Sequence, residues 1–388
     1  MKYTAIFLTA LAMLCPVHMH AQEDPGSKTG FNGYLKFLQT INYQDFNDHW
    51  LIDNLIHNRL NFKYIPDERI RLTAELRNRL FYGDFVKYFP GFDSLIGFDN
   101  GVVDLSFNLA RGNSFLLNST IDRLYLDYTS GNLHVRFGRH RINWGQNLVW
   151  NPNDVFNAFS YFDFDYEERP GTDALRIQYF TGTTSSAEFV YQLGDNLDDM
   201  SFMGMYRFSK WAYDMQFMAG SVKTDLVVGT GWSGNIKGGG FRGEATYFHP
   251  KPGSEQTEGQ LVASVSGDYT FPSSLYLHAS FIYNSLGATG KPGVINPGIL
   301  FGTSAKYLTL SRLGLFGQVS YRISPLFSGG IASIVNPFDG SYFMAPSMTY
   351  SIGDNAELLF IAQIFEGEPG SEFGGIGKLL YFRAKWSF

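Results

Sequence analysis

The chain ends in Leu379-Leu380-Tyr381-Phe382-Arg383-Ala384-Lys385-Trp386-Ser387-Phe388, where apolar and polar side chains alternate. Successive side chains of a β-strand point to opposite faces, so a period of two predicts a strand with one apolar face. A tilted strand of this length crosses the roughly 25 Å of hydrocarbon that an outer-membrane barrel spans. This segment therefore predicts a strand that crosses a membrane with one side toward lipid.

The same pattern recurs along the chain from about residue 30, with turn residues between the copies. Residues 102–111 also alternate, but an additional strand would make the count odd. We therefore assign 83–118 to one long extracellular loop. The count is 18 strands, which is even and puts both termini in the periplasm; it becomes 16 if two weak strands, such as 225–233, are misread. The expected strands are 33–45, 52–65, 69–82, 119–129, 133–142, 172–181, 185–194, 200–208, 211–221, 225–233, 238–248, 258–271, 275–284, 313–323, 326–335, 342–352, 356–365 and 377–388.

Composition and connection lengths favour a membrane barrel over a soluble sandwich. The 388 residues include 36 Phe, 23 Tyr and 42 Gly, and only 17% are charged. Short turns such as 66–68 and 353–355 alternate with long stretches rich in Asn, Asp and Gly. An open sheet edge is not tolerated in lipid, so the sheet must close. The sequence predicts an all-β fold, a transmembrane antiparallel barrel with short periplasmic turns and long extracellular loops.

The N-terminus predicts export. Lys2 precedes an apolar stretch at 3–17, and Met19-His20-Ala21 ends in a small residue. This is typical of a secretory signal peptide over 1–21, and an N-terminal membrane anchor is the alternative. Residues 22–388 then form a single barrel in the outer membrane of a Gram-negative bacterium. The one cysteine, Cys15, lies in the signal, so disulfides and thiol chemistry are excluded from the mature chain.

The lumen is where a function is expected. A barrel of 16 to 18 strands leaves an aqueous channel unless something fills it. The candidate constriction loop is 143–171, because its many aromatic rings would be poorly solvated if the loop stood in water. The alternative is a loop that caps the barrel mouth or packs against a neighbouring subunit. The residues that single this loop out are Trp144, Trp150, Asp163, Asp165, Glu167 and Glu168.

Cations are concentrated in the early strands. If their apolar neighbours face lipid, these cations form a basic wall along the pore, facing the acidic loop, and such a wall favours anions. The alternative is a structural ladder in which arginines pair with Glu75, Asp127, Glu188 or Glu244. A bulge at Gly138 would also turn Arg139 and Arg141 inward, whereas a regular strand leaves them on the outer rim. The expected basic wall consists of Arg59, Arg69, Arg71, Arg77, Arg123, Arg136 and Arg176.

Two segments carry a family resemblance. Residues 136–145, Arg-Phe-Gly-Arg-His-Arg-Ile-Asn-Trp-Gly, resemble the GRQ-x-x-x-WG strand-to-loop signature of porin-like families such as the alginate-export porins, with His140 in place of Gln. The resemblance implies an 18-stranded barrel that passes a specific, often anionic, small solute. Alginate itself is not implied, because no substrate residue can be matched. The terminal Trp386-Ser387-Phe388 resembles the aromatic signal by which the barrel-assembly machinery recognises its clients.

These observations predict a porin-like channel for selective passive diffusion of small anionic or carboxylated solutes. The expected partners are the solute, outer-membrane lipid and, through Phe388, the assembly machinery. Nucleic acid is not expected at a net charge of −6. No cofactor or metal is expected, and an oligomer or assembly partner is left open. The alternatives are a component of a larger export or uptake assembly and, less favoured, a barrel enzyme. His278 and Ser280 share a polar face, but no hydrolase or phosphate-loop motif is present, so we expect no enzyme.

Overall fold

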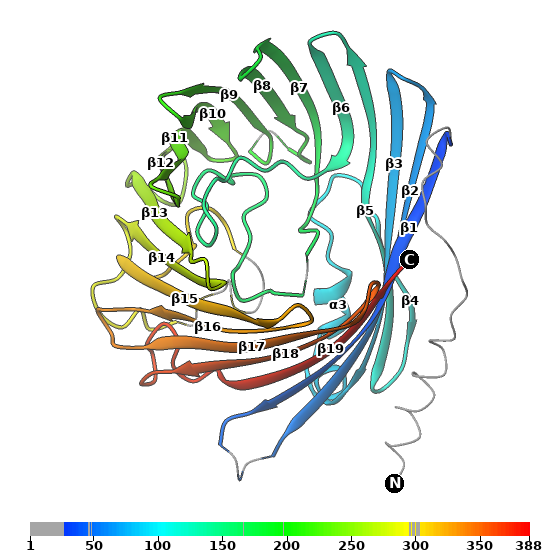
Figure 1. Ribbon diagram of the computed structural model, residues 1–388, viewed down its shortest axis with the longest axis vertical. Coiled ribbons are helices and arrows are strands. Elements are labelled where there is room, and N and C mark those ends of the chain that lie inside the picture. Colours follow the sequence, from blue (N-terminus) through cyan, green and yellow to red (C-terminus); the bar gives the residue numbers. More distant parts are fainter. Residues whose placement is uncertain are drawn as a thin grey trace.

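A computed structural model describes residues 27–388 except 46, 48, 166, 197, 295, 297, 298 and 300–302. The predicted signal peptide, 1–21, lies outside these residues. The described chain is a closed antiparallel barrel with 18 strands in its wall (Figure 1). The wall strands are β1 (Thr29–Tyr43), β2 (Leu51–Asp67), β3 (Ile70–Gly83), β5 (Phe115–Ser130), β6 (Leu133–His140), β7 (Thr172–Gly182), β8 (Ser185–Gln192), β9 (Ser201–Lys210), β10 (Tyr213–Val222), β11 (Asp225–Ile236), β12 (Gly239–Pro250), β13 (Gln260–Thr270), β14 (Leu275–Asn284), β15 (Leu313–Ser324), β16 (Phe327–Val335), β17 (Tyr342–Gly353), β18 (Ala356–Glu366) and β19 (Gly377–Ser387).

The barrel closes where β1 pairs with β19, with Tyr34 opposite Ser387. Gly33 and Phe388 exchange two backbone hydrogen bonds of 2.9 Å, so the last residue completes the seam. A side chain at Gly33 would collide with the Arg59 carbonyl oxygen, so this position requires glycine. Turns at the end that holds both termini are two residues long, except 271–274, and the long connections are at the other end. The predicted closed barrel of 18 strands is confirmed.

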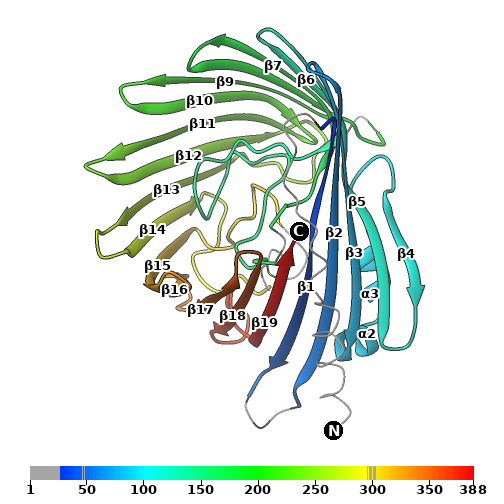
Figure 2. The same cartoon turned by 45° about the vertical axis from the view of Figure 1, so that its right-hand side comes forward.

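The connection after β3 contains more structure than the sequence predicts. It holds α2 (Asp84–Tyr88), α3 (Phe92–Gly97) and a further strand, β4 (Ser106–Arg111). The count of 18 wall strands is right, but the assignment of 106–111 to loop is wrong. β6 pairs only with the last part of β5, so the edge of β5 before it is open, and β4 covers that edge at 116–120. Figure 2 shows β4 beside β5, with both helices at the same end. No helix among the described residues is long and apolar enough to cross a bilayer.

The alternation of side chains divides the wall into an outer and an inner face. On β5, Leu124, Leu126 and Tyr128 are exposed on the outside, whereas Asp127 is buried on the inside. A register shift in the pairing of β3 with β5 adds one residue, Asp122, so that Asp122 and Arg123 are both buried on the lumen side. This bulge breaks the strict alternation on which the prediction of inward positions depends.

Of the two options that the sequence leaves open at Gly138, the structure has the regular strand and not the bulge. Gly138 has a positive φ of 115°, yet β6 pairs with β5 and β7 without a register shift. Arg139 therefore stays on the outer side, which is the other option that the sequence left open. It is buried there because the segment between α3 and β4 folds over it: its guanidinium bonds Asp99, Asp173 and the carbonyl of Val103.

Candidate functional site

The connection between β6 and β7, residues 141–171, lies within the circle of strands and is called the lumen loop below (Figure 1). Its first part packs against β8 and β10. Trp144 is 2% exposed, its indole Nε1 donates to Glu188 Oε1 at 2.6 Å, and its carbonyl accepts from Gln216 Nε2 at 2.6 Å. The loop turns here because Asp154 Oδ1 accepts from the backbone N–H groups of Trp144 and Gly145 at 2.7 and 2.8 Å.

The middle of the lumen loop is held by one buried carboxylate. Glu244, on β12, accepts hydrogen bonds from the backbone N–H groups of Gln146, Asn147 (2.7 Å) and Asn153 (2.9 Å). On β13, Ser264 Oγ donates to the Trp150 carbonyl at 2.9 Å. These contacts satisfy backbone groups that a buried irregular segment would otherwise leave unpaired.

Aromatic rings attach the next part of the loop to β15, β17 and β18. The Tyr161 ring centroid lies 5.0 Å from that of Phe316 on β15, and Phe162 lies 5.0 Å from Phe343 on β17. Both pairs meet edge to face, which is the favoured geometry for such rings. Gln363, on β18, donates to the Phe162 carbonyl at 2.8 Å. The aromatic content of the loop is therefore explained by packing against the inner wall.

The acidic part of the lumen loop reaches β19 and β1. Asp165 pairs with Lys36 at 2.8 Å, and Glu167 pairs with Lys385 at 2.7 Å. Glu168 accepts from the Tyr34 hydroxyl at 2.9 Å. On β5, the Arg123 guanidinium donates to the carbonyls of Glu168 and Arg169, both at 2.6 Å. The loop thus follows the inner wall nearly all the way round before it enters β7.

The predicted constriction residues consequently have different positions from those expected. Trp144 and Trp150 are buried between the loop and the wall rather than at the aperture. Asp165, Glu167 and Glu168 contact the basic side of the barrel directly, so the expected arrangement of an acidic loop facing a basic wall across the pore is not what the structure has. Asp163 is exposed near Arg169, whose Nη1 donates to the Asp163 carbonyl at 3.1 Å.

Four residues of the expected basic wall are neutralised by carboxylates. Arg59 is 0% exposed and pairs with Glu75 at 2.5 Å and Asp122 at 2.6 Å. Arg77 lies 3.4 Å from the same Asp122 carboxylate. The other two pairs are Arg136–Asp127 and Arg176–Glu188, both at 2.6 Å. These four arginines therefore form the structural ladder that was the alternative interpretation. Of the carboxylates expected in that ladder, Glu244 is the exception, because it binds backbone N–H groups of the lumen loop instead of an arginine.

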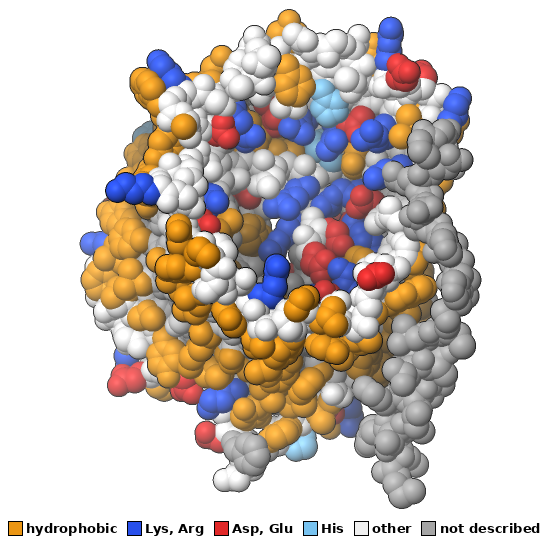
Figure 3. Space-filling model, in the orientation of Figure 1, with side chains coloured by type: hydrophobic (Ala, Val, Ile, Leu, Met, Phe, Trp, Pro, Cys, Tyr) orange, Lys and Arg blue, Asp and Glu red, His pale blue; other side chains and the backbone are white. Residues whose placement is uncertain are grey.

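The remaining cations leave a positive surplus near the turn end of β2 and β3. Arg71 is exposed and shares the inner face with Thr73, and Lys63 lies opposite Thr73 on β2. Arg69 is exposed beside the β2–β3 turn. Within the described part of the chain, Lys63, Arg71 and Arg123 have no carboxylate within 4.0 Å. Figure 3 shows Lys and Arg side chains gathered around a central hollow, with Asp and Glu beside them.

The acids of the lumen loop differ in their ionisation. Burial raises the pKa of Asp154 from 3.8 to about 6, and its Oδ2 has no hydrogen-bond partner among the described residues. Burial also raises the pKa of Glu167, but the hydrogen bond and charge of Lys385 outweigh it and hold that pKa below the ordinary value. Asp154 is therefore the loop acid that takes up a proton under mildly acidic conditions.

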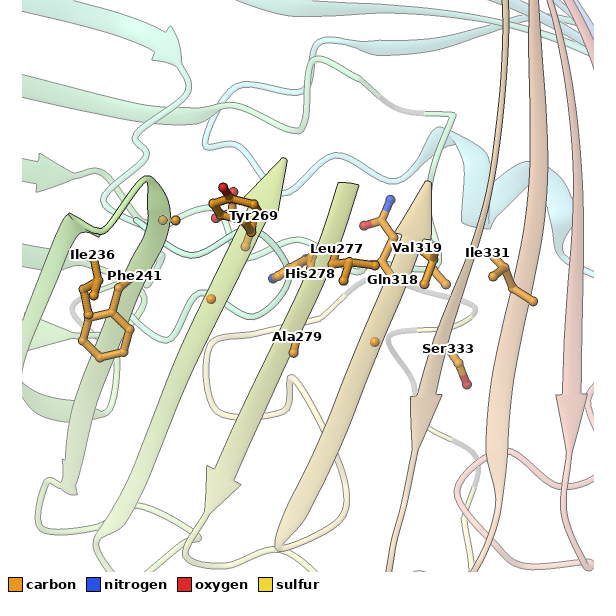
Figure 4. A pocket seen from close by; sticks show the side chains of 16 residues that line it. Ile236, Phe241, Tyr269, Leu277, His278, Ala279, Gln318, Val319, Ile331 and Ser333 are labelled. Carbon is orange, nitrogen blue, oxygen red and sulfur yellow. The ribbon is translucent and has the colours of Figure 1, made fainter. Parts of the chain in front are cut away.

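Two pockets differ in the face they occupy. One of ≈630 Å³ crosses β12 to β16 (Figure 4), where Gly267, Ala279, Gly317 and Ser333 stand opposite one another in register. These positions share the outer face of the barrel with exposed residues such as Leu277, so this pocket lies outside the lumen. A second pocket, of ≈290 Å³, lies in the lumen between the lumen loop and the wall at β15 to β18.

The residues that anchor the loop could not be recognised as anchors from the sequence. Glu244 is named there only as a possible partner of an arginine, whereas it binds backbone N–H groups of the loop. Lys36, Arg383 and Lys385 are inner-face residues of the terminal strands and carry no signal that distinguishes them. The considered pair of His278 and Ser280 forms no hydrogen bond between its members. Ser280 Oγ donates to the Val265 carbonyl at 3.2 Å, and the His278 ring lies 5.0 Å from that of Phe316.

Comparison with known proteins adds structural relatives only. No protein-family model and no curated protein matches the sequence. OccAB4 of Acinetobacter baumannii superimposes with a TM-score of 0.60 over 93% of this chain and 98% of its own, at 8% identity. OccK8 (OprE) of Pseudomonas aeruginosa gives 0.59 over 93% and 98%, at 10% identity. The outer membrane protein OprD of Pseudomonas aeruginosa gives 0.59 over 93% of both chains, at 6% identity. At these identities the likeness shows the fold, which is the porin-type barrel of the OprD and Occ structures.

Proposed function

We propose that the protein is a channel in the outer membrane of a Gram-negative bacterium and passes small polar solutes by passive diffusion. The observation that supports this most is the path of the lumen loop, which lines the inner wall and is anchored to strands all round it. Such a loop narrows a lumen of this size and leaves its middle for solute. The OprD structure is described as an outer membrane protein, which supports the location. The role is transport, not catalysis.

The selectivity that we propose is for anionic or carboxylated solutes. Lys63 and Arg71 supply lumen cations without a carboxylate partner among the described residues, whereas the described carboxylates nearby, Glu75, Asp122 and Asp127, are already paired. Arg123 has no carboxylate partner among them either, but it is buried and its guanidinium holds the lumen loop. Unpaired cations along a pore raise the local concentration of anions, and added salt screens the effect.

The test is the reversal potential of the purified protein in planar bilayers under a salt gradient. We expect a stable conductance with anion preference. In the double variant Lys63→Gln, Arg71→Gln, the anion-to-cation permeability ratio should fall by roughly half, because no carboxylate neutralises these two cations. Arg77 is not a useful target because Asp122 already neutralises it.

Lys210→Gln, at the exposed end of β9, is the matched control and should leave the ratio unchanged. An unchanged ratio in the double variant would remove the selectivity proposal. Absence of any conductance in properly folded protein would remove the channel proposal as well.

We also propose that Phe388 is the contact for the barrel-assembly machinery. Its position as the last residue of the closing seam with Gly33 supports this role, because the seam is the edge that must be paired last. Deletion of Phe388 should lower the amount of folded barrel in the outer membrane, measured by the heat-dependent shift in gel mobility. A Ser387→Ala variant is the control, and equal levels in both would contradict the proposal.

A further inference from the structure

The inner face of the lumen is divided into a charged and an uncharged side. Ion pairs cover β19, β1, β2, β3, β5, β6 and β7. In contrast, β15, β16 and β17 present only uncharged side chains to the lumen in the described chain, apart from Arg322 near the turn end. Their large apolar side chains on this face, Phe316, Ile334 and Phe343, are buried, and Phe316 and Phe343 pack against the lumen loop. Examples of these uncharged side chains are Gln318, Ala332, Ala345, Ser347 and Thr349.

The lumen pocket of ≈290 Å³ lies on this uncharged side. The lumen loop contributes apolar and aromatic groups to it, among them Phe159, Tyr161 and Phe164, and the wall contributes Ser347 and Gln363. The volume is at the small end of the range for ligand pockets, which begins at about 300 Å³. At the packing density of a filled site, the pocket therefore has room for a solute of about one sugar ring.

Two charged groups line the pocket, and their charges are opposite. The Arg169 guanidinium lies 4.0 Å from the centroid of the Phe159 ring and donates to the Asp163 carbonyl at 3.1 Å. Asp163 also lines the pocket, so the site carries no net charge. An anion entering the lumen is thus attracted to the surplus cations near Lys63 and Arg71, and the pocket offers it no comparable attraction.

The walls of the pocket are held in place by contacts behind them. Tyr161 packs edge to face on Phe316, and Phe164 packs on Tyr381 at 4.7 Å between centroids. Gln363 donates to the Phe162 carbonyl at 2.8 Å and accepts from the Tyr381 hydroxyl at 3.2 Å. A site that is ordered before the solute arrives loses little entropy when the solute binds.

We propose that this pocket is a binding subsite for an uncharged polyhydroxylated solute, that is, a monosaccharide. Sugars carry apolar C–H faces, which pack on aromatic rings and aliphatic groups, and hydroxyls, which bond to amides, hydroxyls, carboxylates and guanidinium groups. The pocket places both kinds of group around one volume. The inference rests on the proposed channel function and adds a second solute class, handled on the side of the lumen away from the unpaired cations.

The experiment compares D-glucose with D-glucuronate, which has the same ring and one carboxylate, in single-channel recordings of the full chain. Glucose should reduce the ionic current in a saturable way. Replacement of Ser347 by Phe fills the pocket and should weaken this effect at least about tenfold in half-saturating concentration. Thr349→Phe adds the same ring two residues away on the same face of β17, outside the pocket, and should leave the effect intact.

Several results would overturn the assignment. Glucose without effect on a conducting channel would remove the subsite while the proposed channel function stands. If S347F and T349F weakened the glucose effect on the current equally, the added ring would act only by narrowing the pore. A response to glucuronate that is abolished by S347F as fully as the response to glucose would contradict the uncharged class. Isothermal titration of glucose into detergent-solubilised protein measures the subsite independently, so that heat without conductance would instead count against the channel.

Discussion

At the scale of single residues, buried acids fix the path of the lumen loop. Glu244 binds three loop N–H groups, Glu188 binds the Trp144 indole, and Asp154 binds two N–H groups of its own loop. A buried carboxylate is costly unless hydrogen bonds satisfy it, and here backbone groups without partners do so. Glu244 and Asp154 therefore satisfy loop backbone groups that would otherwise be unpaired, and Glu188 holds the Trp144 side chain.

Glu244 is the anchor whose loss should free the loop most. Glu244→Ala leaves three buried N–H groups without an acceptor, and each costs about 1–3 kcal/mol. Glu244→Gln keeps one acceptor oxygen, so the loop in this variant should be held less firmly than in the native protein and more firmly than in Glu244→Ala. We expect single-channel current noise and protease cleavage within 141–171 to increase in that order.

Asp268→Asn is the control for Glu244, because Asp268 pairs with Arg242 and not with the loop. If current noise and protease cleavage in Glu244→Ala were the same as in the native channel, Glu244 would not be an anchor of the loop.

Asp154 predicts a specific pH dependence of stability. Its pKa is raised in the folded state, from 3.8 to about 6, so the folded chain binds the proton more tightly than the unfolded chain. Its contribution is therefore most favourable below about pH 4 and is lost as the pH rises to about 6, by about 2–3 kcal/mol. The charged groups that face it are Arg141, Arg169 and Glu244.

Asp154→Asn removes this titration. In urea unfolding of detergent-solubilised protein, the variant should gain stability relative to the native chain between pH 4 and pH 6, and the difference should be constant above pH 7. If the free energy of unfolding changed with pH in the same way for both proteins between pH 4 and pH 6, the raised pKa of Asp154 would be contradicted.

At the scale of elements, the two longest connections near β6 take opposite sides of the wall. The lumen loop, between β6 and β7, goes inside. The segment between α3 and β4, in the connection from β3 to β5, folds over the outside of β6 and β7. Arg139 fixes the outer segment through Asp99, Asp173 and the Val103 carbonyl. Residues 136–145 thus contact both sides of the wall: Arg139 holds the segment outside, and Trp144 belongs to the loop inside.

Arg139→Ala should release the outer segment without changing the pore. It leaves the largely buried carboxylates of Asp99 and Asp173 without their cation, and breaking such an ion pair costs up to about 3–5 kcal/mol. Hydrogen exchange over 98–105 should accelerate, while conductance and selectivity stay native. Arg111→Ala breaks the exposed pair with Asp93 in the same segment and should change exchange little. A change in selectivity in R139A would place Arg139 in the pore.

At the scale of the whole molecule, the barrel wall and its filling are separable. Neighbouring strands form the wall, and the ends of β6 and β7 stand side by side, with His140 opposite Thr172. The lumen loop can therefore be removed without stretching the strands that carry it. Aperture and selectivity are then properties of the loop and of the inner face, and the wall sets only the maximum width.

Replacing 145–168 by a four-residue Gly-Ser linker should give a folded barrel whose conductance is roughly threefold higher or more. Shortening 251–259 at the barrel mouth is the control and should leave conductance unchanged. If conductance did not rise in the loop deletion, something other than the lumen loop would limit the aperture.

The sequence by itself determined most of the wall: alternation is local and assigns each residue to the outside or to the lumen, so the 18 wall strands and their turns could be located. The seam at Gly33 and Phe388 and the additional strand β4 could not. The tertiary structure decided the rest. The path of the lumen loop depends on contacts such as Glu244 with Gln146, 98 residues apart, and Lys36 with Asp165. Whether a lumen cation is neutralised depends on which carboxylates the strand register places beside it, as Glu75 and Asp122 are placed beside Arg59. The bulge at Asp122 changes which side chains of β5 face the lumen. Such pairings join residues far apart in the chain, so they leave no periodic trace in the sequence.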